Sequence, residues 1–477
     1  ESRLSLWSFP YLTQPRVLDT NRYKPKRKIR WVAMCSPIAC PDLLIISPMF
    51  SGHQIFRLRL VVGAWLLLLV SPVHGQSSLL YDQEFPVIGY GSAHTSDAVS
   101  QLQERLNRGD LALQFDAERG YLDSVLEALE IDSSTQLLVF SKTSLQVDLI
   151  SAATPRAIYF NDEAYVAWIP GAPALEFAAM DPNLGPVLYT LQQQETDQLI
   201  IERQMHLCLR CHDSFSMTGG GTPRFMMSSS YTGRMGQLIS HEGHIMTTSR
   251  TPLSSRWGGW YVTGNHGDQL HLGNVIVDSA TDLEPQNLAK AGNRTDLDDL
   301  LDTGPYITGK SDIVALLLIE HQVEVQNLIS RVNFNAREAL ADEQREPAQV
   351  QREIESLSEE LLRSMFMVGQ EGLTSPISGE SGFTEMFESL GPMDDRGRSL
   401  RELNLDTRLF EYPLSYLIYS EAFAGLPGPV EDVLFERIND VLLGRDSSRD
   451  FAHLNAEDRR AIREILSATA DFEIETN

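Results

Sequence analysis

Hydrophobic and polar positions in the first half of the chain predict helices followed by short strands. Between residues 97 and 131, apolar residues recur three or four positions apart, as on an amphipathic helix, and a polar break falls at 107–110. From there the spacing changes to a short apolar run at 137–140. Two further apolar runs, 157–160 and 164–169, flank a polar tripeptide, which predicts a β-hairpin.

The middle of the chain carries two contrasting patterns. Residues 195–212 return to helical spacing, whereas 216–276 are rich in Gly, Ser, Thr and Trp and contain few helical signals. We therefore expect a helix that ends near residue 212, followed by loops and short strands.

The second half of the chain has a mainly helical pattern. Ser311 is placed to cap a helix that runs to about Asn333, and a second helix follows Pro347 and runs to about Val368. The sequence 369–382 predicts a flexible linker, and 399–443 predicts further helices that are broken by prolines. The expected fold class is α+β, with helices and a small β-hairpin in the N-terminal part, a loop-rich middle and a mainly α-helical C-terminal half.

A secretory signal precedes this predicted fold. Arg57 and Arg59 stand before the apolar run 60–70, and 71–75 ends on small residues that suit cleavage before Gln76. The apolar run is too short to cross a bilayer unaided. We therefore expect a signal peptide whose removal leaves a periplasmic or secreted protein without a stable membrane span.

Charge restricts the partners of the exported part. The chain has 39 basic and 65 acidic residues, and residues 1–75 hold 10 basic and 3 acidic ones. The remainder therefore carries 29 basic residues against 62 acidic ones, a formal charge of −33. Such a surface repels nucleic acid and anionic membranes, and it attracts a basic partner unless the charge serves only to keep the protein soluble.

Two cysteines and a histidine carry the strongest chemical signal. Residues 208–212 read Cys-Leu-Arg-Cys-His, and Cys208 and Cys211 are the only cysteines after residue 75. On a helix, positions i and i+3 share a face, so both thiols can add to the vinyl groups of one porphyrin while His212 faces the iron. A zinc site would need more Cys or His ligands, and a thioredoxin-like pair would need a βαβ setting.

This motif resembles that of bacterial periplasmic c-type cytochromes. The tracts 256–264, 271–274 and 400–420 are also similar to those of long, uncharacterised cytochrome c-domain proteins with a single CxxCH motif, over most of 80–445. The resemblance implies one covalently bound haem c, attached at Cys208 and Cys211, with His212 as the proximal iron ligand. It also implies electron transfer with a redox partner that the sequence leaves unknown.

The motif completes our division of the chain into regions. These are an upstream segment that we expect not to be translated or kept (1–48), the signal peptide (49–75), an N-terminal α+β region (76–200), a haem-binding region (201–284) and a helical C-terminal region (285–477).

The distal side of the haem decides between electron transfer and catalysis. A sixth protein ligand favours electron transfer, whereas an open position lets peroxide, oxygen or a substrate bind. Three groups of candidates are methionines near the motif, histidines in Gly-rich loops, and a histidine on an apolar helical stripe. They are Met217, Met226, Met227, Met235 and Met246; His241, His244, His266 and His271; and His321.

Further residues fit a haem pocket. The propionates need cationic donors, and Arg224, Arg234, Arg250 and Arg256 fit that role or ordinary surface salt bridges. Trp257, Trp260 and Tyr261 fit either the wall of that pocket or ordinary core packing. The tract 241–244 is a weak candidate for a second metal site. We expect an exported monohaem cytochrome, with a peroxidase- or oxidase-like haem enzyme as the alternative.

Overall fold

The computed structural model describes residues 85–214, 221–239, 243–470 and 474. All of them belong to one compact unit, which spans His74–Asn477. The predicted upstream segment and signal peptide, residues 1–75, lie outside the described residues.

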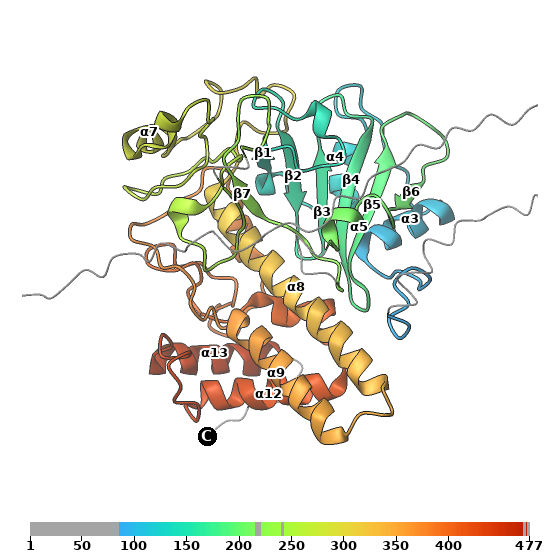
Figure 1. Cartoon of the computed structure of the whole chain (residues 1–477), viewed down its shortest axis with the longest axis vertical. Coiled ribbons are helices and arrows are strands. Elements are labelled where there is room, and N and C mark those ends of the chain that lie inside the picture. Colours follow the sequence, from blue (N-terminus) through green and yellow to red (C-terminus); the bar gives the residue numbers. More distant parts are fainter. Residues whose placement is uncertain (1–84, 215–220, 240–242, 471–473, 475–477) are drawn as a thin grey trace, which may run out of the picture. The chain divides into compact units, whose positions relative to one another are not determined.

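A six-stranded antiparallel sheet organises the N-terminal half, and its strands lie side by side in sequence order (Figure 1). The predicted hairpin is confirmed as the second and third strands, whose register pairs Ile158 with Ala167. Two longer strands follow and extend the sheet. The strands are β1 (Leu137–Val139), β2 (Arg156–Phe160), β3 (Ala164–Trp168), β4 (Ala174–Asp181), β5 (Gly185–Gln192) and β6 (Ile201–Arg203).

Helices α3 (Ala98–Arg108) and α4 (Leu122–Ala128) are the two helices predicted on either side of the polar break. Asp97 caps α3 by accepting hydrogen bonds from the amides of Val99 and Ser100. Gly109 ends the helix with φ of 74°, a conformation that glycine adopts without strain. The apolar sides of both helices share a hydrophobic cluster with one face of the sheet.

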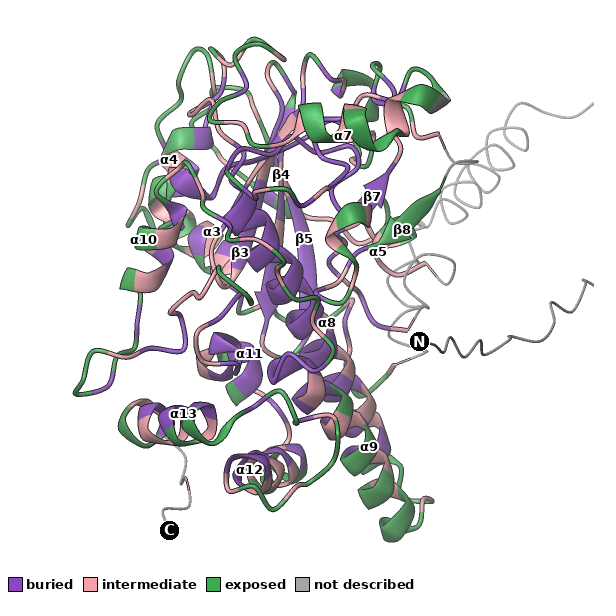
Figure 2. Ribbon diagram, turned by 90° about the vertical axis from the view of Figure 1, so that its left-hand side faces the viewer, coloured by how far each residue is buried: buried purple, intermediate pink, exposed green. Residues whose placement is uncertain are grey.

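The long helix α8 (Ile313–Ala341) contributes to the core on the other face of the sheet. The structure confirms the helix predicted here, although its cap is Asp312, which accepts from the amides of Val314 and Ala315. By length and composition α8 is the one helix among the described residues that meets the criteria for a membrane span. Because 94% of its most apolar window is buried inside the protein, we interpret it as a core helix (Figure 2).

The C-terminal half is mainly helical, as predicted, and helices α9, α12 and α13 lie around the lower part of α8 (Figure 1). Pro347 starts α9 at a position where a missing amide hydrogen costs nothing. The helices after the sheet, apart from α8, are α7 (Pro285–Ala291), α9 (Pro347–Met365), α10 (Phe383–Ser389), α11 (Glu421–Ala424), α12 (Gly428–Leu442) and α13 (Ala456–Thr469).

Two local predictions are wrong. The helix expected over 195–212 exists only as its last turn, because β6 takes the start of that segment into the sheet by pairing with β5. The linker expected at 369–382 is tied down by backbone hydrogen bonds: the amides of Leu373 and Ile377 donate to the loop at 405–407. The stretch is therefore a fixed part of the C-terminal half.

Candidate functional site

The cysteine pair lies on one turn of helix. Helix α5 (Leu209–His212) begins after Cys208, whose carbonyl accepts hydrogen bonds from the amides of Cys211 (3.1 Å) and His212 (3.0 Å). The two cysteines are not joined in a disulfide; Cys208 is half-buried and Cys211 is exposed. The i, i+3 spacing thus places two free thiols on the same side of a single turn.

His212 is held by the extended segment that passes beside α5. Its Nδ1 donates to the carbonyl oxygen of Arg224 at 2.7 Å, and the amide of Arg224 donates to the carbonyl of His212 at 2.9 Å. A carbonyl can only accept, so Nδ1 carries the hydrogen and the neutral ring keeps its lone pair on Nε2. Burial lowers the pKa of His212, which favours that neutral form.

The partner segment is itself anchored on both sides. The amide of Phe225 donates to Asn327 Oδ1 of α8 at 2.9 Å, and Asn327 Nδ2 donates back to the carbonyl of Phe225 at 3.0 Å. The Phe225 ring packs against Tyr165 of β3, with ring centroids 4.8 Å apart. Helix α8 and the sheet therefore fix the carbonyl that orients His212.

A half-buried ion pair lies beside the motif on the sheet. Arg156 of β2 and Glu176 of β4 approach to 3.3 Å. Burial raises the pKa of the Cys208 thiol to about 11, and the charge of Glu176 adds to that rise. The charge of Arg156 also lowers the pKa of His212, whereas the charge of Glu176 raises it. Neither residue is predicted from the sequence; the available signals were Arg156 at the start of an apolar strand and Glu176 inside another.

Of the four arginines predicted to bind propionates, only Arg224 contacts the motif directly. Its Nε is buried and has no hydrogen-bond partner among the described residues, and the same holds for Nε of Arg156. The other three are paired elsewhere: Arg234 with Asp278, Arg250 with Glu324, and Arg256 with Glu320. Arg156 and Arg224 thus each have an unused buried donor near α5.

The distal candidates of the loop region lie around a small hairpin. Strand β8 (His244–Met246) pairs with β7 (Ser228–Ser230), and its residues are exposed. His244 and Met246 alternate with Ile245, so they share one face of β8. Met226 is half-buried and follows Arg224 by two positions. Met217 and His241 lie outside the described residues.

The other candidates are enclosed, with the exception of Met235. His321 is fully buried, its Nε2 contacts Ser415 Oγ at 2.8 Å, and burial lowers its pKa to about 4. His271 is 2% exposed and packs against Trp257 and His266, and burial lowers its pKa to about 3. Met227 and His266 are also buried, whereas Met235 is 64% exposed.

The aromatic candidates pack in the core. Tyr261 donates through its amide to Leu138 of β1 and through its hydroxyl to the carbonyl of Ala152. Trp260 donates through Nε1 to Ser228 of β7. They hold the loop region against the sheet. No group of three or more His, Cys, Asp or Glu residues is arranged to hold a metal ion within the described part of the chain, which does not include His241.

Comparisons with known proteins add no relative. No family model matches the chain, and searches of curated proteins and of solved structures return no match. The function is therefore argued from the site alone.

Proposed function

We propose that this chain is an exported monohaem c-type cytochrome that transfers electrons. Cys208 and Cys211 bind the haem covalently, and His212 is the proximal iron ligand. The observation that carries the proposal is the hydrogen bond from His212 Nδ1 to the carbonyl of Arg224, next to two free thiols on one helical turn. Metal-binding histidines commonly donate their second ring nitrogen to such an acceptor, which orients the first.

Other residues near the motif suit the remaining parts of a haem. Arg156 and Arg224 have buried Nε atoms without partners, and propionates are anions that would satisfy them. Leu207 beside the motif is 54% exposed, and Ile245 and Met246 of β8 are 42% and 37% exposed. A porphyrin is largely apolar and would cover such side chains. Bound haem supplies a one-electron iron couple.

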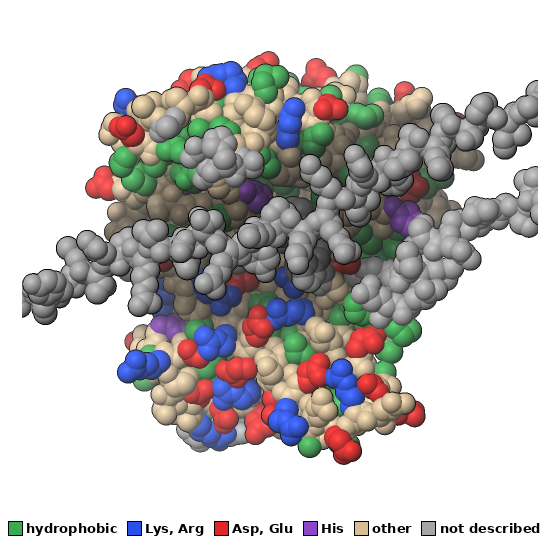
Figure 3. Space-filling model, viewed as in Figure 1, with side chains coloured by type: hydrophobic (Ala, Val, Ile, Leu, Met, Phe, Trp, Pro, Cys, Tyr) green, Lys and Arg blue, Asp and Glu red, His purple; other side chains and the backbone are tan. Residues whose placement is uncertain are grey.

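The partner that exchanges electrons would be basic. The part after residue 75 carries a formal charge of −33, so attraction to a cationic surface is long-ranged and weakens with salt. On the face in Figure 3, acidic and basic side chains are interspersed over the C-terminal helices. That pattern fits an acidic surface without one dominant patch, so salt dependence of the electron-transfer rate is the measurement that tests this docking.

A haem enzyme with an open distal position is the second candidate. The observation that favours it is the burial of His271 and His321, because neither imidazole can reach a haem at α5 while it stays in the core. The spectrum separates the two functions. A low-spin haem that binds cyanide or carbon monoxide slowly supports electron transfer, and a high-spin haem that binds them readily supports the enzyme.

Covalent attachment is tested on denatured protein. One haem per chain with a c-type pyridine haemochrome spectrum is expected, and the Cys208→Ser, Cys211→Ser double variant should lose it. Haem that extracts from the wild type into acidic organic solvent would overturn the proposal. N-terminal sequencing of the periplasmic fraction tests export, with Gln76 as the expected first residue; finding residues 1–48 in the purified protein contradicts it.

A further inference from the structure

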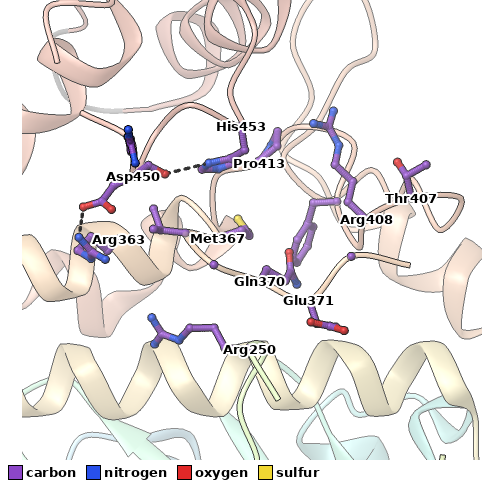
Figure 4. Close-up of a pocket in the computed structure, with 15 residues that line it drawn as sticks. Arg250, Arg363, Met367, Gln370, Glu371, Thr407, Arg408, Pro413, Asp450 and His453 are labelled. Carbon is purple, nitrogen blue, oxygen red and sulfur yellow. Dashed lines mark hydrogen bonds and ion pairs between the residues drawn. The ribbon is translucent and has the colours of Figure 1, made fainter. Parts of the chain in front are cut away.

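A cavity of about 620 Å³ lies mainly in the C-terminal half. Cys208, Cys211 and His212 are not among the residues that line it. Its walls are the end of α9 with the loop behind it, the loop at 407–413, and the segment 449–453 before α13; Arg250 reaches in from the opposite side (Figure 4). Pockets of this size accommodate small organic ligands.

The lining has more basic than acidic side chains, whereas the protein as a whole is acidic. Four arginines line the cavity, against two carboxylates, whereas the whole chain has a formal charge of −26. The charged residues of the lining are Arg250, Arg363, Arg408 and Arg449, with Glu371 and Asp450. Two of these arginines pair with carboxylates outside the lining, so the positive charge that a ligand meets depends on which arginines stay unpaired.

Three of the four arginines form ion pairs with carboxylates of the protein. Arg363 pairs with Asp450, Arg250 with Glu324, and Arg408 with Asp458. Arg449 makes no ion pair within the described part of the chain. A guanidinium offers five donors in a planar fork, so Arg449 can bind two oxygens of one phosphate or carboxylate group.

The cavity also has an apolar part, and its walls are connected. Met367, Phe410 and Pro413 provide the apolar part of the lining. The walls are joined by hydrogen bonds: His453 Nε2 contacts the carbonyl of Phe366 at 2.7 Å, and the amide of Glu371 donates to the carbonyl of Ser249 at 3.0 Å. These hydrogen bonds hold the walls in place, which lowers the ordering cost of binding.

We propose that this cavity binds a small organic anion, with a phosphate or carboxylate head on Arg449 and an apolar body against Met367, Phe410 and Pro413. Arg449, the arginine of the lining without an ion pair among the described residues, recognises the head, and the apolar part of the lining recognises the body. The site is separate from the haem motif and goes beyond electron transfer.

Titration calorimetry on the purified protein tests the site with four probes. Phenyl phosphate and benzoate carry both head and body and differ in the head, inorganic phosphate is a head alone, and phenol is a body alone. At least one of the first two should bind with one site per chain. Raising sodium chloride from about 50 to about 300 mM should weaken that binding.

Two variants locate the binding. Arg449→Gln should raise the Kd of the probe by about fivefold or more, whereas Arg460→Gln should change that Kd by less than about twofold. Arg460 is an exposed arginine of α13 outside the cavity lining, which makes it a matched control. The Cys208→Ser, Cys211→Ser variant should bind the probe like the wild type, so failure of the haem proposal would leave this result unchanged.

Three outcomes overturn the inference. They are no binding of either phenyl phosphate or benzoate at millimolar concentration, equal effects of the two arginine substitutions, and phenol binding as tightly as the anions. Inorganic phosphate that binds as tightly as phenyl phosphate would overturn the role of the apolar lining. Circular dichroism spectra of the variants establish that they are folded before binding is measured.

Discussion

His212 and Arg224 are joined by two hydrogen bonds that run in opposite directions. The ring Nδ1 of His212 donates to the carbonyl of Arg224, and the Arg224 amide donates to the carbonyl of His212. The first bond fixes the ring and the second fixes the backbone that bears it. If His212 binds iron as proposed, its ring is already oriented and loses little freedom on binding.

If haem is bound as proposed, loss of the His212 imidazole should change the haem without releasing it. In His212→Ala the two thioethers still hold the porphyrin, but iron is left to water or another side chain. We expect covalent haem with an altered Soret band and a shifted reduction potential, because the axial ligand is a main control on potential. Absorption spectra and redox titration of the purified variant measure both.

His206 provides the control for that experiment. It lies two residues before Cys208, is exposed, and does not belong to the turn that carries the motif. His206→Ala should leave the spectrum unchanged. If instead His206→Ala disrupts the spectrum and His212→Ala does not, the proximal assignment is wrong.

Breaking the buried ion pair between Arg256 and Glu320 should lower stability more than breaking the pair between Arg250 and Glu324. Their side chains are 4% and 0% exposed and approach to 2.9 Å. Glu320→Gln leaves the charge of Arg256 buried without a counter-charge, which should lower the free energy of unfolding by about 3–5 kcal/mol. Glu324→Gln is the matched variant, since its partner Arg250 is 42% exposed and stays hydrated. Urea unfolding that gives equal losses would contradict this.

His321 should make stability depend on pH. Burial lowers its pKa to about 4 from the usual 6.5. On acidification the unfolded chain takes up a proton first, so the free energy of unfolding falls between about pH 6.5 and pH 4. Between pH 7.5 and pH 5, His321→Gln should lose about 2 kcal/mol less stability than the wild type.

The control for this pH dependence is His94→Gln. The His94 side chain is 80% exposed, so its loss should leave the pH dependence of the wild type in place. Denaturant melts at both pH values provide the comparison. If the free energy of unfolding of His321→Gln changes between the two pH values as much as that of the wild type, the buried ring is not the group that titrates.

Two glycines separate backbone strain from steric clash. Gly236 and Gly397 have φ of 76° and 80°, so alanine at either position is strained by about 1 kcal/mol. A Cβ at Gly236 would also meet the carbonyl oxygens of Phe140 and Ile150 at 2.7 and 2.9 Å, whereas nothing lies within 4 Å at Gly397. Gly236→Ala should therefore be about 1–3 kcal/mol less stable than Gly397→Ala in urea unfolding. Equal losses would mean that the loop moves to accept the methyl group.

The elements that were predicted correctly carry their signal locally. Helix α8 shows an apolar pattern over many turns, and α9 begins at a proline. Strand β6 was taken for helix because its state depends on pairing with β5, which no local spacing reveals. The longest strands, β4 and β5, were not predicted, since a continuous apolar run fits a buried strand and a buried helix equally.

Part of the candidate site is likewise predictable from the local sequence, and part depends on the fold. The thiols and His212 follow from five consecutive residues, but Arg224 acts through a backbone carbonyl that every residue type possesses. Arg156 and Glu176 become neighbours of the motif only through the register of β2, β3 and β4. The supposed linker at 369–382 was wrong because its hydrogen-bond partners lie in distant loops.

The position of α8 in the chain sets an order of maturation. The six strands of the sheet and the turn with Cys208, Cys211 and His212 are synthesised before α8, which binds the β2–β3 connection of the sheet through Gln322 and Gln326. Every growing chain therefore passes through a stage in which that face, with Phe160, Tyr165 and Met180, has no helix to pack against. Until α8 is made, this apolar surface leaves the growing chain prone to aggregation.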